Sequence, residues 1–334
     1  MNYKKLILYS IFWVAFDLKA QDFHFSQFYA SPLTLNPALT GRFNGDYRLG
    51  AIHRSQWNGI QSNSFLYQTP GVSSEFNFFN QKASLGVLAI NDQTNDKTFN
   101  TFLGGISFGY KILFERLQLS FGIQGTYSTT YLDRNKITQG ALQIEPTTFE
   151  NIENFDFNSG IFANYNFEDE NILYFGVALN HLLSPNDNFV IKARDNKLPI
   201  KIIFHSGSEI VLNDKIKLIP GFLFAFQANA SESNLGGTIN YKLTDKSENN
   251  LFLNFGIWSR FNYLKAESFI PKFGLDYSNL RLLFSYDYNI TNIQNATNIS
   301  NNKTPNTFEV SLNIIIQRNK VKEYEDCYIF NPRF

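Results

Sequence analysis

The chain has 334 residues, of which 35 are Phe and 17 are Tyr, and only 17% are charged. Aromatic residues suit a pleated sheet, and soluble domains carry roughly 25% charged residues, so the composition favours an all-β protein with much apolar surface. The net charge is zero, which argues against a nucleic-acid partner because no basic excess is present to neutralise phosphates.

The first twenty residues have the form of a secretion signal. Lys4 and Lys5 precede an apolar run over residues 6–16, which is too short to span a bilayer, and Ala20 suits signal cleavage. The mature chain would begin at Gln21. No later stretch supplies the ~18 apolar residues of a spanning helix, so a mature chain that enters a membrane must do so as a barrel.

Residues 21–41, QDFHFSQFYASPLTLNPALTG, are aromatic but do not alternate as a strand does. Pro32 and Pro37 each remove a backbone donor and restrict the residue before them. Aromatic rings in an irregular segment need a surrounding wall, so we predict that residues 21–46 form an N-terminal plug inside a barrel. Asn36-Pro37 is a turn element that would fold the segment back into the barrel mouth.

Period-two alternation then predicts about fourteen strands. They cover residues 47–56, 64–79, 83–91, 100–112, 116–130, 155–167, 171–182, 199–212, 215–227, 234–244, 250–261, 268–278, 280–290 and 306–318. Arg54 and Trp57 are expected to end the first strand, with Trp57 in the interfacial aromatic belt. Pro70-Gly71 could break the second strand, and Pro220 predicts a β-bulge.

Strand and loop lengths distinguish a membrane barrel from a soluble sandwich, which would also alternate. Many predicted strands have ten to fourteen residues, whereas soluble strands average about five to six. Residues 92–99, 131–154, 183–198, 262–267 and 291–305 are longer connections, and tight turns lie between them. The sequence therefore predicts a closed antiparallel transmembrane β-barrel over residues 47–318, with both termini on the short-turn, periplasmic side.

Residues that could carry chemistry are few. The four histidines, His24, His53, His181 and His205, lack a second His or Cys at ligand spacing, and Cys327 is alone, so no metal, cofactor or disulfide is expected. The predicted lumen charges are Lys272, Asp276, Arg281, Asp287 and Glu309. They form either a salt-bridge network that stiffens the lumen or a lining for a polar solute.

Two further features have alternative interpretations. Residues 319–334 follow the last strand and would form a periplasmic tail, either a disordered end or a dock for a periplasmic protein. The loops over residues 131–154 and 291–305 are rich in Asn, Thr and Gln, as expected of solvated loops or of protein-binding ones.

The run DFHFSQFY over residues 22–29, followed by Pro32, the tetrapeptide LNPA over residues 35–38, Arg48 and RSQW over residues 54–57, resembles the start of mature PorP/SprF proteins. These are outer-membrane barrels of the type IX secretion and gliding motility system of Bacteroidetes. Phe23 departs from the Pro that is common there. The candidate plug or partner-binding residues are Phe25, Gln27, Phe28, Tyr29, Asn36, Pro37, Arg54 and Trp57.

The resemblance implies a non-enzymatic role in secretion or surface attachment of adhesins. It also implies a peptidoglycan-binding periplasmic partner of the PorE-like kind. It leaves open whether the chain is a core secretion component or serves one adhesin. A FadL-like transporter of small hydrophobic solutes is the alternative, and a lipid-hydrolysing barrel enzyme using His181 or His205 is a third hypothesis.

Overall fold

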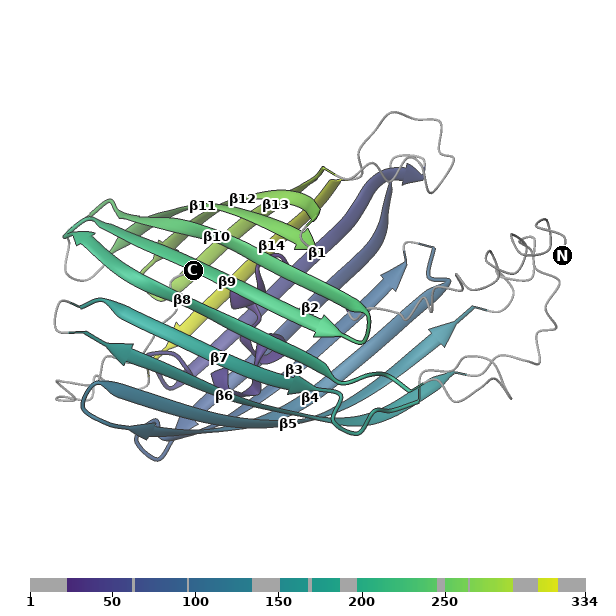
Figure 1. Ribbon diagram of the computed structural model, residues 1–334, viewed down its shortest axis with the longest axis horizontal. Coiled ribbons are helices and arrows are strands. Elements are labelled where there is room, and N and C mark those ends of the chain that lie inside the picture. The colour runs from purple at the N-terminus through teal and green to yellow at the C-terminus, as the bar shows by residue number, and fades with distance from the viewer. Residues whose placement is uncertain are drawn as a thin grey trace, which may run out of the picture.

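The computed structural model describes residues 23–61, 64–94, 96–133, 151–167, 170–186, 197–244, 250–263, 265–290 and 306–317. Fourteen antiparallel strands within them close into a barrel, in which each strand pairs with its neighbours in sequence and the first pairs with the last. Figure 1 shows the ring of strands. The predicted fold class is confirmed. In the described part of the chain, no helix has the length and apolarity to cross a bilayer.

The strands are 9 to 16 residues long, and a tilted strand needs about 9–11 residues to cross a membrane. They are β1 (Tyr47–Gln61), β2 (Ser64–Phe78), β3 (Ala83–Thr94), β4 (Phe99–Leu113), β5 (Leu117–Leu132), β6 (Ile152–Asn166), β7 (Ile172–Asn180), β8 (Lys201–Asn213), β9 (Ile216–Gln227), β10 (Ala230–Lys242), β11 (Leu251–Asn262), β12 (Lys265–Tyr277), β13 (Leu280–Asn289) and β14 (Asn306–Ile316).

The two ends of the barrel differ in their connections. Residues 133–151, 181–200 and 290–305 follow β5, β7 and β13, and we call this side the long-loop end. The connections 95–98 and 263–264 at the same end are tight. The prediction of long loops at 92–99 and 262–267 was wrong, because β3 and β12 extend into those stretches. The opposite side is the short-turn end.

Three prolines lie within strands without shifting the register. Pro70 pairs with His53, Pro220 with Gly237 and Pro271 with Ile257. The β2–β3, β8–β9 and β12–β13 ladders each lack pairs at these positions. Each proline lacks a backbone N–H, and this loss interrupts the pairing with only one of its two neighbouring strands. The predicted bulge at Pro220 and the predicted break at Pro70-Gly71 were wrong.

The first strand is longer than predicted. β1 continues to Gln61, and a register shift relative to β14 between Ser55 and Asn58 surrounds Trp57, whose φ is 59°. Trp57 and Arg54 therefore do not end the strand. A bulge lets the strand carry an extra residue and continue pairing. Placement of Trp57 in an interfacial belt stays a prediction.

The outer face is apolar along the strands, as the alternation predicted. Phe121 and Ile123 are 45% and 57% exposed, whereas Ser120, which directly precedes Phe121 and points to the other face, is 1% exposed. The inner face is not uniformly polar. One part of it is apolar and comes mainly from β6 to β12: Phe162, Tyr174, Ala178, Ile203, Ile219, Leu223, Ala225, Trp258 and Ile270.

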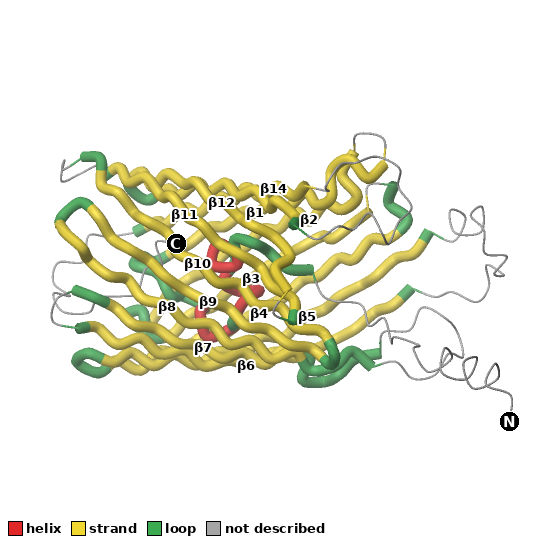
Figure 2. The backbone as a smooth tube through the Cα atoms, turned by 45° about the horizontal axis from the view of Figure 1, so that its top comes forward, coloured by secondary structure: helices red, strands yellow, loops and turns green. Residues whose placement is uncertain are grey.

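Residues 23–46, which we call the N-terminal segment, lie inside the barrel (Figures 1 and 2). They contain the 3-10 helices η1 (Phe28–Ala30) and η2 (Pro37–Leu39) and the short helix α2 (Pro32–Leu35). Phe28, Leu35 and Leu39 pack against the apolar part of the wall. The N-terminal segment buries its apolar side chains against the wall. The wall positions that face it are therefore apolar, as in a protein core.

The N-terminal segment runs along the lumen from one end to the other. His24 lies beside Glu232 at the start of β10, which is at the long-loop end. Gly41 contacts Lys111 and Glu75, near the ends of β4 and β2 at the short-turn end. The expectation that both termini lie at the short-turn end was therefore wrong for the first described residues, although β14 does end there.

Candidate functional site

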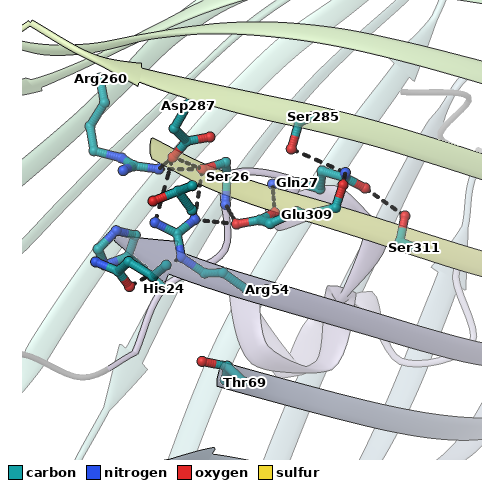
Figure 3. A network of polar contacts seen from close by, with 12 residues as sticks. His24, Ser26, Gln27, Arg54, Thr69, Arg260, Ser285, Asp287, Glu309 and Ser311 are labelled. Atoms are coloured by element: carbon teal, nitrogen blue, oxygen red, sulfur yellow. Dashed lines mark hydrogen bonds and ion pairs between the residues drawn. The ribbon is translucent and has the colours of Figure 1, made fainter. Parts of the chain in front are cut away.

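A buried charge cluster on the wall holds Ser26 (Figure 3). The Ser26 backbone N–H donates to Glu309 Oε1 over 2.6 Å, and its hydroxyl donates to Asp287 Oδ2 over 2.6 Å. Lys272 Nζ donates to the Ser26 carbonyl oxygen over 2.7 Å. Arg54 and Arg260 both donate to the Ser26 hydroxyl. Every polar group of this residue is therefore satisfied by the wall.

Gln27 is bound at the next position (Figure 3). Its backbone N–H donates to Glu309 Oε2 over 2.8 Å, so one carboxylate accepts two successive backbone amides. Its side-chain amide donates to Ser285 Oγ over 3.1 Å and accepts from Ser311 Oγ over 2.6 Å. Residues of two neighbouring strands, β13 and β14, therefore bind both the backbone and the side-chain amide of Gln27.

The charges in this cluster balance. Arg54 pairs with Glu309 and lies 3.5 Å from Asp287, measured between its Nη2 and Oδ2. Arg260 Nη2 lies 3.1 Å from Asp287 Oδ2, and its Nε lies 3.4 Å from Glu232 Oε1. Removing one partner from a buried pair leaves an uncompensated charge, which costs about 3–5 kcal/mol. We therefore expect the cluster to hold the segment in one register.

Lys272 also faces aromatic rings. Its Nζ lies 4.4 Å from the ring centroid of Trp258 and 5.4 Å from that of Phe28. Phe28 meets Trp258 edge-on at 5.5 Å, and Tyr29 meets Tyr174 edge-on at 6.5 Å. The aromatic residues of the segment and of the wall thus interlock next to the charge cluster.

Phe25 belongs to a second apolar cluster. Its ring meets that of Phe23 at 5.9 Å, and it packs with Leu33, Ile52 and Leu88. Trp57 lies apart from these contacts, with its ring 5.8 Å from that of Tyr67. Of the candidate residues on the first strand, Arg54 therefore contacts the N-terminal segment, whereas the Trp57 ring contacts another residue of the wall.

Asn36 and Pro37 lie against the middle of the wall. Asn36 Nδ2 donates to the carbonyl oxygens of Ile161 over 3.1 Å and of Val177 over 3.3 Å, and lies 3.1 Å from His205 Nε2. Asn36 Oδ1 accepts from Ala38 N–H over 2.9 Å and so caps η2. The predicted turn at Asn36-Pro37 is present as this capped 3-10 helix.

The wall makes room for this turn with glycines. A Cβ at Gly122 would collide with the Pro37 backbone, and one at Gly160 would collide with Asn36 Oδ1. Gly122 lies on β5 and Gly160 on β6, and the two residues pair across the ladder. The missing side chains let the Pro37 backbone approach Gly122 and the Asn36 side chain approach Gly160.

A third group of contacts lies at the short-turn end. Gly41 N–H donates to Glu75 Oε2 over 2.8 Å, and Lys111 Nζ donates to the Gly41 carbonyl oxygen over 2.6 Å. Arg48 makes a bidentate pair with Glu75, with both bonds at 2.8 Å. Arg42 donates to Gln118 Oε1 over 3.0 Å and lies 5.1 Å from the Phe162 ring centroid.

The structure divides the predicted lumen charges into two groups. Lys272, Asp287 and Glu309 meet at Ser26. Asp276 and Arg281 instead pair with each other across the β12–β13 ladder, next to the turn that joins these strands, with Arg281 Nε 2.9 Å from Asp276 Oδ1. The charge cluster and this pair are therefore separate features.

Sequence reasoning missed four of the charged residues that surround the N-terminal segment, Glu75, Lys111, Glu232 and Arg260. Glu232 lies before residue 234, where the sequence predicts the start of its strand, and so falls outside every predicted strand. Arg260, Glu75 and Lys111 fall within predicted strands at inward positions. Each of these three is the single charged residue of its predicted strand. That pattern was the signal in the sequence that could have identified them. In the described residues, no group of three or more His, Cys, Asp or Glu could hold a metal.

A closed, outward-apolar barrel of this kind is an outer-membrane β-barrel. The family model for the type IX secretion system membrane protein PorP/SprF matches residues 17–314. The chain belongs to this family, and it is a membrane component of the type IX secretion system. A comparison with curated proteins gives no match.

Solved structures similar to the chain are outer-membrane channels. The toluene transporter TbuX of Ralstonia pickettii is 9% identical with a TM-score of 0.50, covering 86% of this chain and 94% of its own. A FadL homologue of Pseudomonas aeruginosa is 10% identical with a TM-score of 0.48, covering 84% and 92%. The similarity to TbuX at this identity shows the barrel fold.

Proposed function

We propose that this barrel is a non-enzymatic component of the type IX secretion and gliding motility system that supports secretion, or attachment to the cell surface, of secreted adhesins. The observation that carries the proposal is the filled lumen. The N-terminal segment makes buried hydrogen bonds with Glu309, Asn36 lies on the wall, and Glu75 binds Gly41. A barrel occupied in this way suits an anchor better than an open channel.

The proposed partners are the outer-membrane lipid, a secreted adhesin or other type IX client, and a periplasmic peptidoglycan-binding protein of the PorE-like kind. Lipid is supported by the exposed apolar side chains of the outer face, such as Phe155 at 73%. The other two are supported by membership of the family. The tail over residues 319–334, the signal over residues 1–20 and Cys327 lie outside the described residues.

Deletion of the gene tests the anchoring role in the source bacterium. We expect the adhesin to be lost from the cell surface, as measured with antibodies on intact cells, while growth on simple carbon sources is unchanged. Complementation with the wild-type gene should restore surface adhesin. Normal surface adhesin in the deletion strain would contradict the proposal.

The FadL-like transporter is a second candidate, favoured by a cavity of about 120 Å³ beside Phe25, Phe28 and Leu223. The two candidates differ in whether gene deletion abolishes uptake of a hydrophobic solute, and conductance tests whether the lumen is plugged. We propose that the N-terminal segment is a plug, so the purified wild-type protein should carry no ion current in a planar bilayer. Removal of residues 23–40 should open the lumen. Equal currents from both proteins would contradict the plug, and solute uptake lost on gene deletion would favour transport.

A further inference from the structure

The cavity of about 120 Å³ lies between the N-terminal segment and the wall, towards the long-loop end. Its apolar lining comes from both sides. Phe25 and Leu35 contribute from the N-terminal segment, and Ile203, Leu223 and Ala225 contribute from β8 and β9. The N-terminal segment therefore forms one wall of the cavity, and the barrel strands form the other.

The lining also contains two buried polar atoms that find no hydrogen-bond partner within the described part of the chain, Asn234 Oδ1 and His24 Nε2. Asn234 is 2% exposed, and its Nδ2 already donates to Glu232 Oε1 over 2.7 Å. Its carbonyl oxygen is therefore an acceptor left without a donor. A buried acceptor without a donor is destabilising, so a ligand that donates a hydrogen bond to it is favoured.

His24 lies beside the same carboxylate, with its Nδ1 3.8 Å from Glu232 Oε2. This distance is too long for a hydrogen bond, so the contact does not set the tautomer of the ring, and Nε2 is either a donor or an acceptor. Asn234 Oδ1 can only accept, and it calls for a ligand that donates.

The cavity volume limits the size of that ligand. An engineered protein cavity of about 150 Å³ lined by Leu, Ile and Phe binds benzene. A volume of about 120 Å³ therefore suits one six-membered ring or a chain of similar size. Lys201 also lines the cavity, so a carboxylate is the competing head group that the experiment must distinguish.

We propose that this cavity binds a small amphipathic alcohol or amine, with an apolar body about the size of one six-membered ring against Phe25, Ile203 and Leu223 and a donor group bonded to Asn234 Oδ1. The site is independent of the role in secretion. Its failure would leave the proposed function intact, and a deletion strain that keeps its surface adhesin would leave the site intact.

Calorimetric titration of the purified full-length protein in detergent tests the proposal with phenol, aniline, benzene and benzoate as probes. Phenol and aniline should bind saturably at one site, and benzene and benzoate about tenfold more weakly. Asn234→Leu removes the acceptor, so phenol should lose about tenfold in affinity while benzene is unaffected. Ala225→Phe fills the apolar part and should abolish binding of all four probes.

Asn240→Leu is the matched control. Asn240 lies on the same strand, is 1% exposed and also has an Oδ1 without a partner among the described residues, but it does not line the cavity. Phenol affinity should be unchanged in this variant. Equal affinity for phenol and benzene, tighter binding of benzoate, an equal effect of Asn240→Leu and Asn234→Leu, or binding that survives Ala225→Phe would each overturn the proposal.

Discussion

Glu309 illustrates how one residue of the wall fixes the position of the N-terminal segment. Its two carboxylate oxygens accept the backbone N–H groups of Ser26 and Gln27 at 2.6 and 2.8 Å, and it pairs with Arg54. Because two of these bonds are to backbone, the carboxylate sets where the segment sits regardless of most of its side chains. Charge-assisted bonds of this kind are stronger than neutral ones.

Substitution Glu309→Gln should therefore release residues 26 and 27 from the wall. A carboxamide supplies one acceptor oxygen instead of two and leaves the charge of Arg54 with less compensation. We expect a loss of about 3–5 kcal/mol in the local stability of the segment. Hydrogen exchange of the Ser26 and Gln27 amides should rise accordingly, by at least about a hundredfold.

The matched control for this experiment is Asp276→Asn. Asp276 is also a carboxylate on the lumen side, but its salt bridge is with Arg281 and it makes no contact with Ser26 or Gln27 among the contacts described. Exchange of these amides should remain as in the wild type. Accelerated exchange in the control, or unchanged exchange in Glu309→Gln, would contradict the role of Glu309.

At the scale of elements, the contact between η2 and β5 depends on one missing side chain. A methyl group at Gly122 would collide with the backbone at Pro37 and Ala38. Gly125, three residues along the same strand, would place its Cβ 3.7 Å from Phe157, which is an ordinary contact. The two glycines therefore separate the effect of filling the contact from the general effect of replacing a strand glycine.

We expect Gly122→Ala to lower stability by about 1–3 kcal/mol, the usual cost of overpacking. Gly125→Ala should be neutral or slightly stabilising, because alanine restricts the unfolded chain more than glycine does. Thermal unfolding in detergent, followed by tryptophan fluorescence, to which Trp57 and Trp258 contribute, measures both. Equal effects of the two substitutions would show that η2 does not pack on β5 as described.

Sequence alternation predicted the strands well because one face of each strand meets lipid. β2 was predicted within one residue, and both ends of β13 within one residue. The strand β9 was also predicted within one residue, but the expected polar inner face was wrong there. Ile219, Leu223 and Ala225 of β9 point inward although they are apolar, because they pack on the N-terminal segment, and no pattern within β9 could reveal that partner. The pairing of Glu232 with Arg260 likewise depends on register between strands.

At the scale of the whole molecule, sequence reasoning predicted the wrong end of the barrel for the start of the N-terminal segment. An even strand count puts the start of β1 and the end of β14 at the same end. The segment then adds a full pass through the lumen, from His24 beside Glu232 to Asp46, whose N–H donates to the Ile316 carbonyl oxygen over 3.0 Å. Outer-membrane barrels place short turns in the periplasm and longer loops outside.

Phe23 should therefore lie on the external side of the membrane, and Asp46 on the periplasmic side. In a Cys327→Ser background, which removes the single native thiol, Phe23→Cys should react with a membrane-impermeant maleimide on intact cells. Asp46→Cys should react only after the outer membrane is permeabilised, because its route from outside is blocked by the segment itself. Since Phe23 is partly exposed and packs beside Phe25, its labelling should be slower than that of an external loop cysteine but complete.

Labelling of Asp46→Cys on intact cells with protection of Phe23→Cys would reverse the assigned orientation, and labelling of both would mean that the lumen is open to the reagent.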